Sequence, residues 1–378
     1  MVSINQDQVN LRESVIRFAR REVTGRGELY SLDILPRDLW RAIGGEGLPG
    51  LLLPREFGGL GGGHVSGVVA TEALVFASGS MGLGLSLAVH LLLSRVYLRY
   101  SGTGQRAEHL TKLASGAATL SLAVSEPGVG AHPKGLNTTA SLQGDFYVLN
   151  GEKTYLTNGP LADWFIVLAV TGQAGKFKRF TAFLIPRDTA GLQTGEPMQL
   201  GFFRPSSHCN IRLENCQVPE SAVLGEKDSA YESIALPFRD LEEVYLMSIA
   251  CGGMMRRLKV FIEAAGASGP PGDEICERAG ELDSVVNSLR LLTYEAATGL
   301  ESGIPPPELH RLSFAFRSIA NHALAIFERV ESAHGLSSHP ELTVLANDLH
   351  HGLKIAGSAV RHNLRKLGDR LLSGKAIE

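Results

Sequence analysis

Hydrophobic positions recur with a helical period at both ends of the chain and with a strand period in its middle. Near the start, Leu11, Val15, Phe18 and Ala19 fall on one helical face, with charged residues on the other. From about residue 119 the pattern changes to short alternating or β-branched runs, separated by glycine, asparagine and proline turns. This pattern is typical of an antiparallel β-domain.

Four long amphipathic stretches follow, over residues 230–266, 273–302, 306–335 and 341–373. Long helices joined by short loops predict an up-and-down bundle. The fold class is therefore predicted to be α+β. We expect a helical domain over residues 1–118, a β-domain over 119–228 and a four-helix bundle over 229–378.

One apolar segment, VFASGSMGLGLSLAVHLLLS (75–94), is about long enough to span a membrane and contains no Asp, Glu, Lys or Arg. It also contains three glycines, four serines and a histidine, which weaken it as a lipid-facing helix. We therefore expect a buried helix within a helical layer, without membrane insertion.

Composition bears on the class of protein, its partners and its cellular compartment. Hydrophobic residues make up 44% and charged residues 20%, which is typical of a globular protein. A formal net charge of −3 gives no electrostatic reason to expect nucleic acid as a partner. The four cysteines are irregularly spaced and form no CxxC pair, and the first residues lack an apolar signal core. We expect reduced thiols, no export and a cytoplasmic location.

Three ordered motifs carry a resemblance to a known family. LAVSEPGVG (122–130), VLNGEKTYLTNGPLADWFIVLAVT (148–171) and ENCQVPESAVLG (214–225) resemble successive strands and turns of the acyl-CoA dehydrogenases in order and spacing. The resemblance implies FAD held between a β-barrel-like domain and a helical bundle, in dimers or tetramers. It also implies removal of the α-proton and β-hydride of an acyl thioester on coenzyme A or a carrier protein. The electron acceptor would be a protein such as an electron-transfer flavoprotein.

The same resemblance implies the flavin contacts. Ser125 would bond the pyrimidine edge, Tyr155 would pack on the isoalloxazine and Thr157 would lie near N5. The turn in VSEPGVG presents backbone amides that can face a ring edge and phosphates. The remaining cofactor candidates are Leu122, Val124, Gly130, Ala131 and Ser358, and the substrate candidates are Ala131, Phe238, Leu241, Tyr245 and Gly357. The alternative for each hydroxyl is an ordinary surface residue of a β-hairpin.

Several positions depart from the family pattern. Ala131-His132 replaces the usual Ser-Asp after the glycine turn, and the first bundle loop, GASGPPGD, has no arginine. Glu331 and His334 replace a glutamine and a glycine of a later turn. Cofactor contacts across a subunit interface are therefore expected to differ from those of the family.

The largest departure concerns the catalytic base. Ala356 occupies the position of the usual glutamate, although its backbone N–H could still bind the thioester carbonyl. A minority of the family places the base in a segment that resembles RDLEEVYLM, which assigns the role to Glu242. Apolar residues at helical spacing run through this segment and indicate an inward face. A carboxylate enclosed there would have a raised pKa, suited to removing an α-proton.

Two other interpretations of this segment stay open. Asp240 and Glu243 have the spacing of a capping box, so Glu243 is either a cap or a replacement for the family's arginine. If the helix begins near Tyr231, with Pro237 in its first turns, neither glutamate is a cap.

The leading hypothesis is a flavin-dependent acyl thioester dehydrogenase with Glu242 as the base. One alternative is a non-catalytic subunit that pairs with an active homologue, because Ala356 cannot accept a proton. Another is a flavin-dependent oxygenase on the same fold. The histidines have no metal-ligand spacing, so no metal site is expected.

Overall fold

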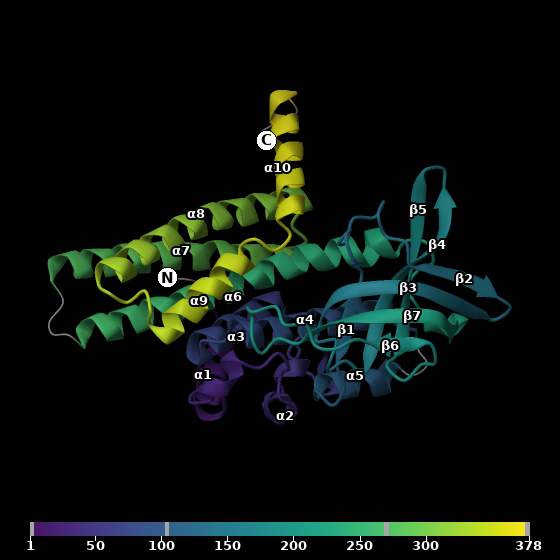
Figure 1. The fold of residues 1–378 in the computed structure, drawn as a ribbon, viewed down its shortest axis with the longest axis horizontal. Coiled ribbons are helices and arrows are strands. Elements are labelled where there is room, and N and C mark those ends of the chain that lie inside the picture. The colour runs from purple at the N-terminus through teal and green to yellow at the C-terminus, as the bar shows by residue number, and fades with distance from the viewer. Residues whose placement is uncertain (1–3, 103–105, 268–271, 375–378) are drawn as a thin grey trace. The chain divides into compact units, whose positions relative to one another are not determined.

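The computed structural model describes residues 4–102, 106–267 and 272–374, and helices precede and follow a set of strands (Figure 1). The helices are α1 Gln6–Glu22, α2 Arg37–Gly45, α3 His64–Ser78, α4 Met81–Tyr100, α5 Arg106–Ala114, α6 Leu236–Gly266, α7 Asp273–Ser302, α8 Pro306–Ala333, α9 Pro340–Gly352 and α10 Gly357–Leu372. The strands are β1 Leu120–Ala123, β2 Thr139–Gln143, β3 Phe146–Thr157, β4 Trp164–Ala174, β5 Phe177–Pro186, β6 Leu192–Thr194, β7 His208–Pro219 and β8 Val223–Leu224. The predicted α+β class is confirmed.

Close contacts divide the chain into two compact units, each built from segments distant in sequence. The helical unit comprises residues 1–24, 64–84 and 243–378, and the β unit comprises residues 25–63 and 85–242. Each unit combines separate segments of the chain, so the units cannot be compared directly with the three consecutive domains predicted from the sequence. The predicted domain boundaries therefore stay predictions.

The strands of the β unit form one mixed sheet in the order β6-β7-β3-β2-β4-β5-β8, with β1 paired to β4. Most neighbours are antiparallel, as expected, but β1 and β4 are parallel, and so are β2 and β4 where Thr139 meets Val170. Apolar side chains such as Phe165, Phe183 and Ile211 fill the core of this unit. Burying each stabilises the fold by about 1.5–3 kcal/mol.

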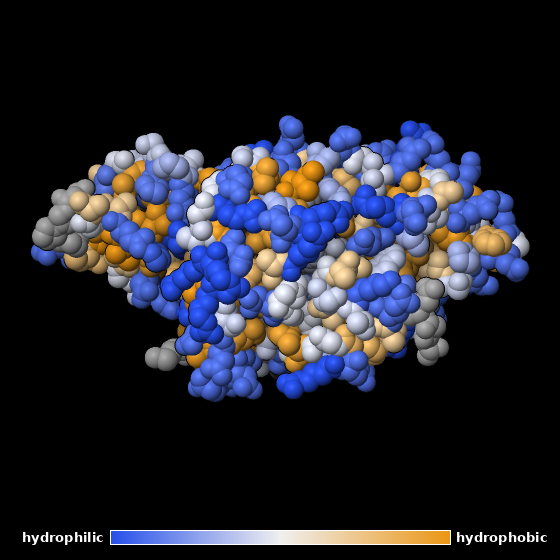
Figure 2. All heavy atoms as spheres, turned by 90° about the horizontal axis from the view of Figure 1, so that it is seen from below, coloured by the Kyte–Doolittle hydropathy of each residue, from blue (hydrophilic) through white to orange (hydrophobic). Residues whose placement is uncertain are grey.

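The apolar segment 75–94 forms parts of two helices. Gly79 adopts a φ of 74°, a left-handed conformation that glycine tolerates, and separates α3 from α4. By length and composition α4 could cross a membrane, but 89% of its most apolar window is buried within the protein. One nitrogen of its buried histidine has a partner there, because His90 Nε2 lies 3.0 Å from the Leu113 carbonyl oxygen. On the face drawn in Figure 2, apolar residues are interspersed among polar ones.

The C-terminal helices follow the predicted pattern except for the last. Helices α6, α7 and α8 correspond to the first three amphipathic stretches, and α7 and α8 run side by side within the helical unit (Figure 1). The fourth stretch is divided into α9 and α10, which meet at residues 353–356. Residues 268–271 of the predicted loop GASGPPGD lie outside the described residues.

Candidate active site

A pocket of about 150 Å³ opens in the β unit where β1, β3 and the beginning of α6 meet. Eight of its lining residues are those that the sequence predicts: Leu122, Val124, Ser125, Ala131, Tyr155, Thr157, Phe238 and Glu242. The other six lining residues are not among those predicted from the sequence, and they are Val89, Thr154, Tyr231, Ala235, Leu236 and Arg239. The pocket therefore gathers the predicted flavin-facing side chains and the predicted base on one surface.

A β-bulge in β3 shapes the wall of this pocket. Lys153 pairs with Ile211 of β7 and Leu156 pairs with Cys209, so three steps along β3 match two along β7. Within the bulge, Tyr155 has a φ of 58° and is 61% exposed. A left-handed conformation is costly for a tyrosine, and such strain concentrates at functional sites. The bulge holds an aromatic ring in the pocket instead of in the core.

Thr157, at the end of β3, is tied to a buried histidine. Its Oγ1 lies 3.0 Å from His208 Nε2, and His208 Nδ1 lies 3.1 Å from the Ser206 carbonyl oxygen. Burial lowers the pKa of His208 to about 4, so the ring is neutral at pH 7. Because a carbonyl only accepts, Nδ1 carries the proton and Nε2 accepts from the Thr157 hydroxyl. Thr157 is thereby left with its oxygen lone pairs for a ligand in the pocket.

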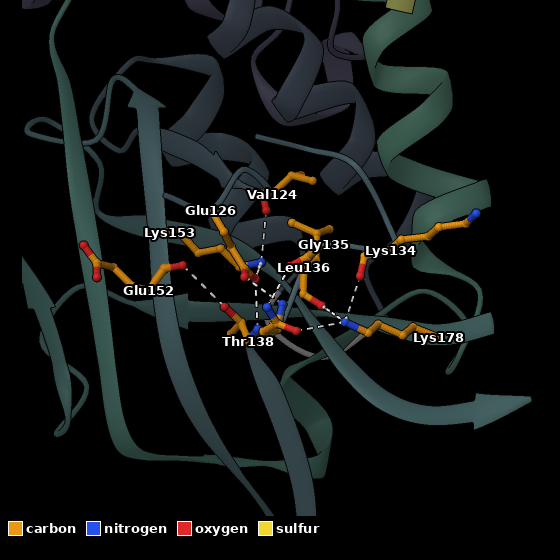
Figure 3. Close-up of polar contacts among 10 residues, drawn as sticks. Val124, Glu126, Lys134, Gly135, Leu136, Thr138, Glu152, Lys153 and Lys178 are labelled. Carbon is orange, nitrogen blue, oxygen red and sulfur yellow. Dashed lines mark hydrogen bonds and ion pairs between the residues drawn. The ribbon is translucent and has the colours of Figure 1, made fainter. Parts of the chain in front are cut away.

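A buried ion pair supports the loop that follows β1. Lys153 Nζ donates to Glu126 Oε1 at 2.9 Å and to the Val124 carbonyl at 3.0 Å (Figure 3). Glu126 also accepts the backbone amides of Asn137 and Thr138, at 2.7 and 2.9 Å. Burial lowers the pKa of Lys153 to about 8. Burial alone would raise the pKa of Glu126, but Lys153 and the two amides lower it overall. Both groups are charged at pH 7, and they fix the backbone beside Ser125.

The α6 side of the pocket begins with a π-helical turn, Tyr231–Ala235, that continues directly into α6. Asp240 therefore lies inside a helix, and the prediction that Glu243 completes a capping box is wrong. The Tyr231 hydroxyl donates to the Ala131 carbonyl at 3.2 Å, which fixes the turn where the family's Ser-Asp is missing. Glu242 and Arg239 lie one helical turn apart and both line the pocket.

Three predicted residues of this region do not line the pocket. Gly130 closes the loop after β1 by exchanging two backbone hydrogen bonds of 3.0 Å with Glu126. Leu241 is half-buried outside the lining. Tyr245 is only 1% exposed and lies in the core of the helical unit, where its hydroxyl oxygen is 3.4 Å from His64 Nδ1. Its role as a substrate contact stays a prediction.

The last three predicted residues, Ala356, Gly357 and Ser358, lie in the helical unit at the beginning of α10. Ala356 has a φ of 56° and precedes the first turn of the helix. Within the described ranges its amide donates to no backbone carbonyl, whereas the Gly357 amide donates to the Lys354 carbonyl at 3.1 Å. The predicted oxyanion donor is thus available for a ligand, although its role stays a prediction.

The structure accounts for two of the unusual charged positions. Glu331 forms a buried bidentate pair with Arg257 at 2.7 and 2.7 Å, so its carboxylate is engaged inside the helical unit. Glu243, in the place of the family's arginine, forms a similar pair with Arg317 of α8. Elsewhere in the described part of the chain, no group of three or more His, Cys, Asp and Glu side chains is arranged to hold a metal ion.

The donor set of the pocket fits a planar heteroaromatic cofactor. Ser125 and Thr157 offer hydroxyl groups, Tyr155 offers an aromatic face, and Leu122 and Val124 offer apolar contacts. These features agree with the flavin-dependent oxidoreductase that the family resemblance of the three sequence motifs implies. The residues above are those that would hold the flavin.

Comparison with known proteins identifies the family. The N-terminal domain of acyl-CoA dehydrogenases matches residues 5–117, and their middle domain matches residues 121–216. The mitochondrial isovaleryl-CoA dehydrogenase of Solanum tuberosum is 31% identical over 305 residues, which covers 78% of this chain and 74% of the relative. The chain belongs to the acyl-CoA dehydrogenase family and is an FAD-dependent oxidoreductase.

Solved structures share the fold over almost the whole chain. Glutaryl-CoA dehydrogenase from Mycobacterium smegmatis, in complex with FADH2, has a TM-score of 0.85 and 23% identity, covering 99% of this chain and 97% of that one. The prolyl acyl carrier protein oxidase AnaB has a TM-score of 0.84 and 24% identity, covering 97% and 99%. The family resemblance drawn from the three sequence motifs is confirmed.

Some of the missed pocket residues carried a signal in the sequence. Tyr231, Ala235 and Arg239 precede Glu242 by eleven, seven and three residues, which is the spacing of one helical face. His208 carried none, because its contact with Thr157 depends on the register between β3 and β7 across 51 residues.

Proposed function

We propose that the protein dehydrogenates an acyl thioester between its α- and β-carbons, with Glu242 removing the α-proton. The observation that carries this proposal is that Glu242 lines the same pocket as Ser125, Tyr155 and Thr157. A base must lie within reach of the carbon acid while the hydride acceptor lies on the opposite side of the substrate. When bound, FAD supplies that acceptor.

The other residues have supporting roles. Tyr155 and the apolar side chains of β1 exclude water from the flavin side of the pocket, which strengthens electrostatic interactions inside it. Phe238 contributes an apolar contact for the acyl chain. The family resemblance implies that the Ala356 amide donates to the thioester carbonyl, which would stabilise negative charge there as the α-proton leaves.

The thioester is carried by coenzyme A or by an acyl carrier protein. Relatives named isovaleryl-CoA dehydrogenase support the first carrier, and the structural similarity to the prolyl acyl carrier protein oxidase AnaB supports the second. We propose an electron-transfer flavoprotein as the physiological electron acceptor, following the family resemblance.

We also propose that the protein forms a homodimer or homotetramer. Helix α10 has no buried residue in the single chain. Its apolar residues Val360, Leu364, Leu367 and Leu371 recur at helical spacing and form one face. A second copy of the chain is the partner that would cover this face.

Anaerobic flavin bleaching tests the proposed reaction. The purified protein is mixed with isovaleryl-CoA and with acyl carrier protein thioesters, and the flavin absorbance is followed. We expect bleaching in the wild type and a decrease of about 100-fold or more in its rate for Glu242→Gln. Asp240→Asn is the matched control, because this neighbouring carboxylate does not line the pocket.

Two outcomes would contradict the proposal. Wild-type rates in Glu242→Gln would show that another group is the base. A wild-type protein that binds FAD but is bleached by none of these thioesters would favour the non-catalytic subunit, an alternative that the missing carboxylate at Ala356 supports.

A further inference from the structure

The pair between Glu243 and Arg317 does more than neutralise two charges inside the helical unit. Arg317 Nε and Nη2 each donate to a Glu243 carboxylate oxygen at 2.7 Å, which is the bidentate geometry of a strong charge-assisted pair. Ser313 donates to the same carboxylate. The Arg317 side chain is 11% exposed and that of Glu243 is 15% exposed. Both charges are thus held in a single geometry with little access to water.

The remaining donors of Arg317 bind the backbone between α9 and α10. Nη1 donates to the Leu353 carbonyl at 2.5 Å, and Nη2 also donates to the Ile355 carbonyl at 3.1 Å. These carbonyls belong to the Ala356 turn, which we define as residues 353–356. The guanidinium therefore bonds the peptide group immediately before Ala356. That peptide group contains the Ala356 N–H, so its orientation depends on the position of Arg317.

The Ala356 turn needs an external restraint. Ala356 has a φ of 56°, which is unfavourable for alanine, and such a conformation persists only where the surroundings impose it. No residue of α10 is buried within the single chain, so packing inside the chain supplies little restraint on the turn. Among the described residues, the guanidinium of Arg317 is the side-chain group that bonds two carbonyls of the turn.

We propose that Glu243 and Arg317 are positioning residues that hold the Ala356 turn so that the Ala356 N–H can donate to a thioester carbonyl. Glu243 acts through Arg317, and Arg317 acts through the backbone. The inference rests on the proposed function, because it assigns a purpose to the amide that the proposed reaction uses. The inference also explains why residue 243 is a glutamate where the family has an arginine. The carboxylate there orients an arginine on the facing helix, and that arginine binds the turn.

Double substitution separates this role from simple stabilisation of the bundle. In Glu243→Met with Arg317→Met, apolar side chains of similar length replace a buried ion pair, a change that is often neutral or stabilising. The matched control is Arg257→Met with Glu331→Met. That pair also joins α6 to α8 through two bonds of 2.7 Å and is buried, but it does not contact the Ala356 turn.

Hydrogen exchange measures the turn without an acyl thioester. In the full chain with FAD bound, we expect the hydrogen-bonded amides of residues 353–355 and of Gly357 to exchange about tenfold faster in the Glu243/Arg317 double variant than in the wild type. The Arg257/Glu331 control should leave their exchange unchanged. Equal exchange in the wild type and the Glu243/Arg317 variant would show that this pair does not hold the turn, which would overturn the inference.

Two ligands that differ by one carbonyl oxygen test the positioning role. Isovaleryl-CoA contains the thioester carbonyl, and S-(3-methylbutyl)-CoA is the thioether without it. We expect the ratio of their affinities to fall about 5- to 10-fold in the Glu243/Arg317 double variant, equivalent to about one hydrogen bond, and to stay constant in the control. Infrared spectra of the carbonyl-labelled thioester should show a smaller shift to low frequency in the same variant.

The outcomes distinguish the two proposals. A wild-type carbonyl shift that persists in the Glu243/Arg317 variant would overturn the positioning role and leave the proposed function intact. A wild type without any carbonyl shift on binding isovaleryl-CoA would contradict the use of the Ala356 amide, and the positioning role would fall with it.

Discussion

The helical unit and the β unit bury polar side chains in different ways. In the helical unit, arginine–glutamate pairs connect neighbouring helices, as Arg317 does with Glu243 and Arg290 does with Glu72. In the β unit, polar side chains satisfy backbone groups of strand ends and loops. Glu126 accepts two loop amides there, and the neutral His208 donates to a carbonyl.

The difference follows from the backbone of each unit. Helix interiors satisfy their own N–H and C=O groups, so long charged side chains are free to pair with one another across helices. Strand ends and loops leave backbone groups without partners, and buried side chains must supply them. A change of charge in the helical unit can therefore be matched by one partner, as at Glu243. In the β unit, a change at Glu126 removes the acceptor of two loop amides, so it disturbs the whole loop.

The largest expected effect comes from removing one member of a buried ion pair. We expect Arg257→Met in the helical unit and Lys153→Met in the β unit each to lower the free energy of unfolding by about 3–5 kcal/mol, because each leaves an unpaired buried carboxylate. Urea unfolding followed by circular dichroism measures both changes.

The two double variants should differ in how much of the lost stability they recover. Arg257→Met with Glu331→Met should recover most of the lost stability, because both charges are gone. Lys153→Met with Glu126→Met should not, because the amides of Asn137 and Thr138 lose their acceptor. Equal recovery in both double variants would remove the distinction between the units.

Acid should weaken the β unit through its buried histidines. Burial lowers the pKa of His90 and of His208 to about 4, below the value of about 6.5 in an unfolded chain. The stability that these neutral rings contribute is fully present above pH 6.5 and is lost as the pH falls towards 4. The loss approaches about 3 kcal/mol for each histidine.

Unfolding free energies measured between pH 7.5 and pH 4.5 test this expectation. His208→Gln should reduce the slope below pH 6.5. His322→Gln, at an exposed position on α8, is the control and should not change it. A wild-type curve that is flat between pH 6.5 and pH 4.5 would show that the two rings are not held neutral.

The same contrast explains how far the sequence could predict the molecule. The periodicity predicted α1 and the long helices, because burial on one face is local information. It could not predict the division of the last helix at the Ala356 turn, which depends on Arg317 of another helix. The motifs predicted Ser125, Tyr155 and Thr157 through the family resemblance. His208 and the pairing of Glu243 depend on side chains that meet only after folding, so they were missed.

A smaller effect is expected at the hydroxyl that His208 orients. Thr157→Val removes one hydrogen-bonding group from the pocket, so FAD affinity should fall about fivefold, or about 1 kcal/mol. Fluorescence titration of the apoprotein with FAD measures this change. Thr171→Val is a suitable control, because Thr171 bonds Thr181 and Asp228 and does not line the pocket. Equal affinities for all three proteins would place Thr157 outside the flavin contacts.

The smallest expected effect concerns the strained tyrosine and has opposite signs for stability and binding. Tyr155 has a φ of 58°, so Tyr155→Asn should relieve strain and raise the free energy of unfolding by up to about 1 kcal/mol. The same change removes the aromatic face and should weaken FAD binding. Leu142→Asn, at an exposed β2 position with ordinary backbone geometry, is the control for introducing asparagine and should not stabilise the protein. If Tyr155→Asn lowers stability and leaves FAD affinity unchanged, the bulge serves the packing of the sheet and not the pocket.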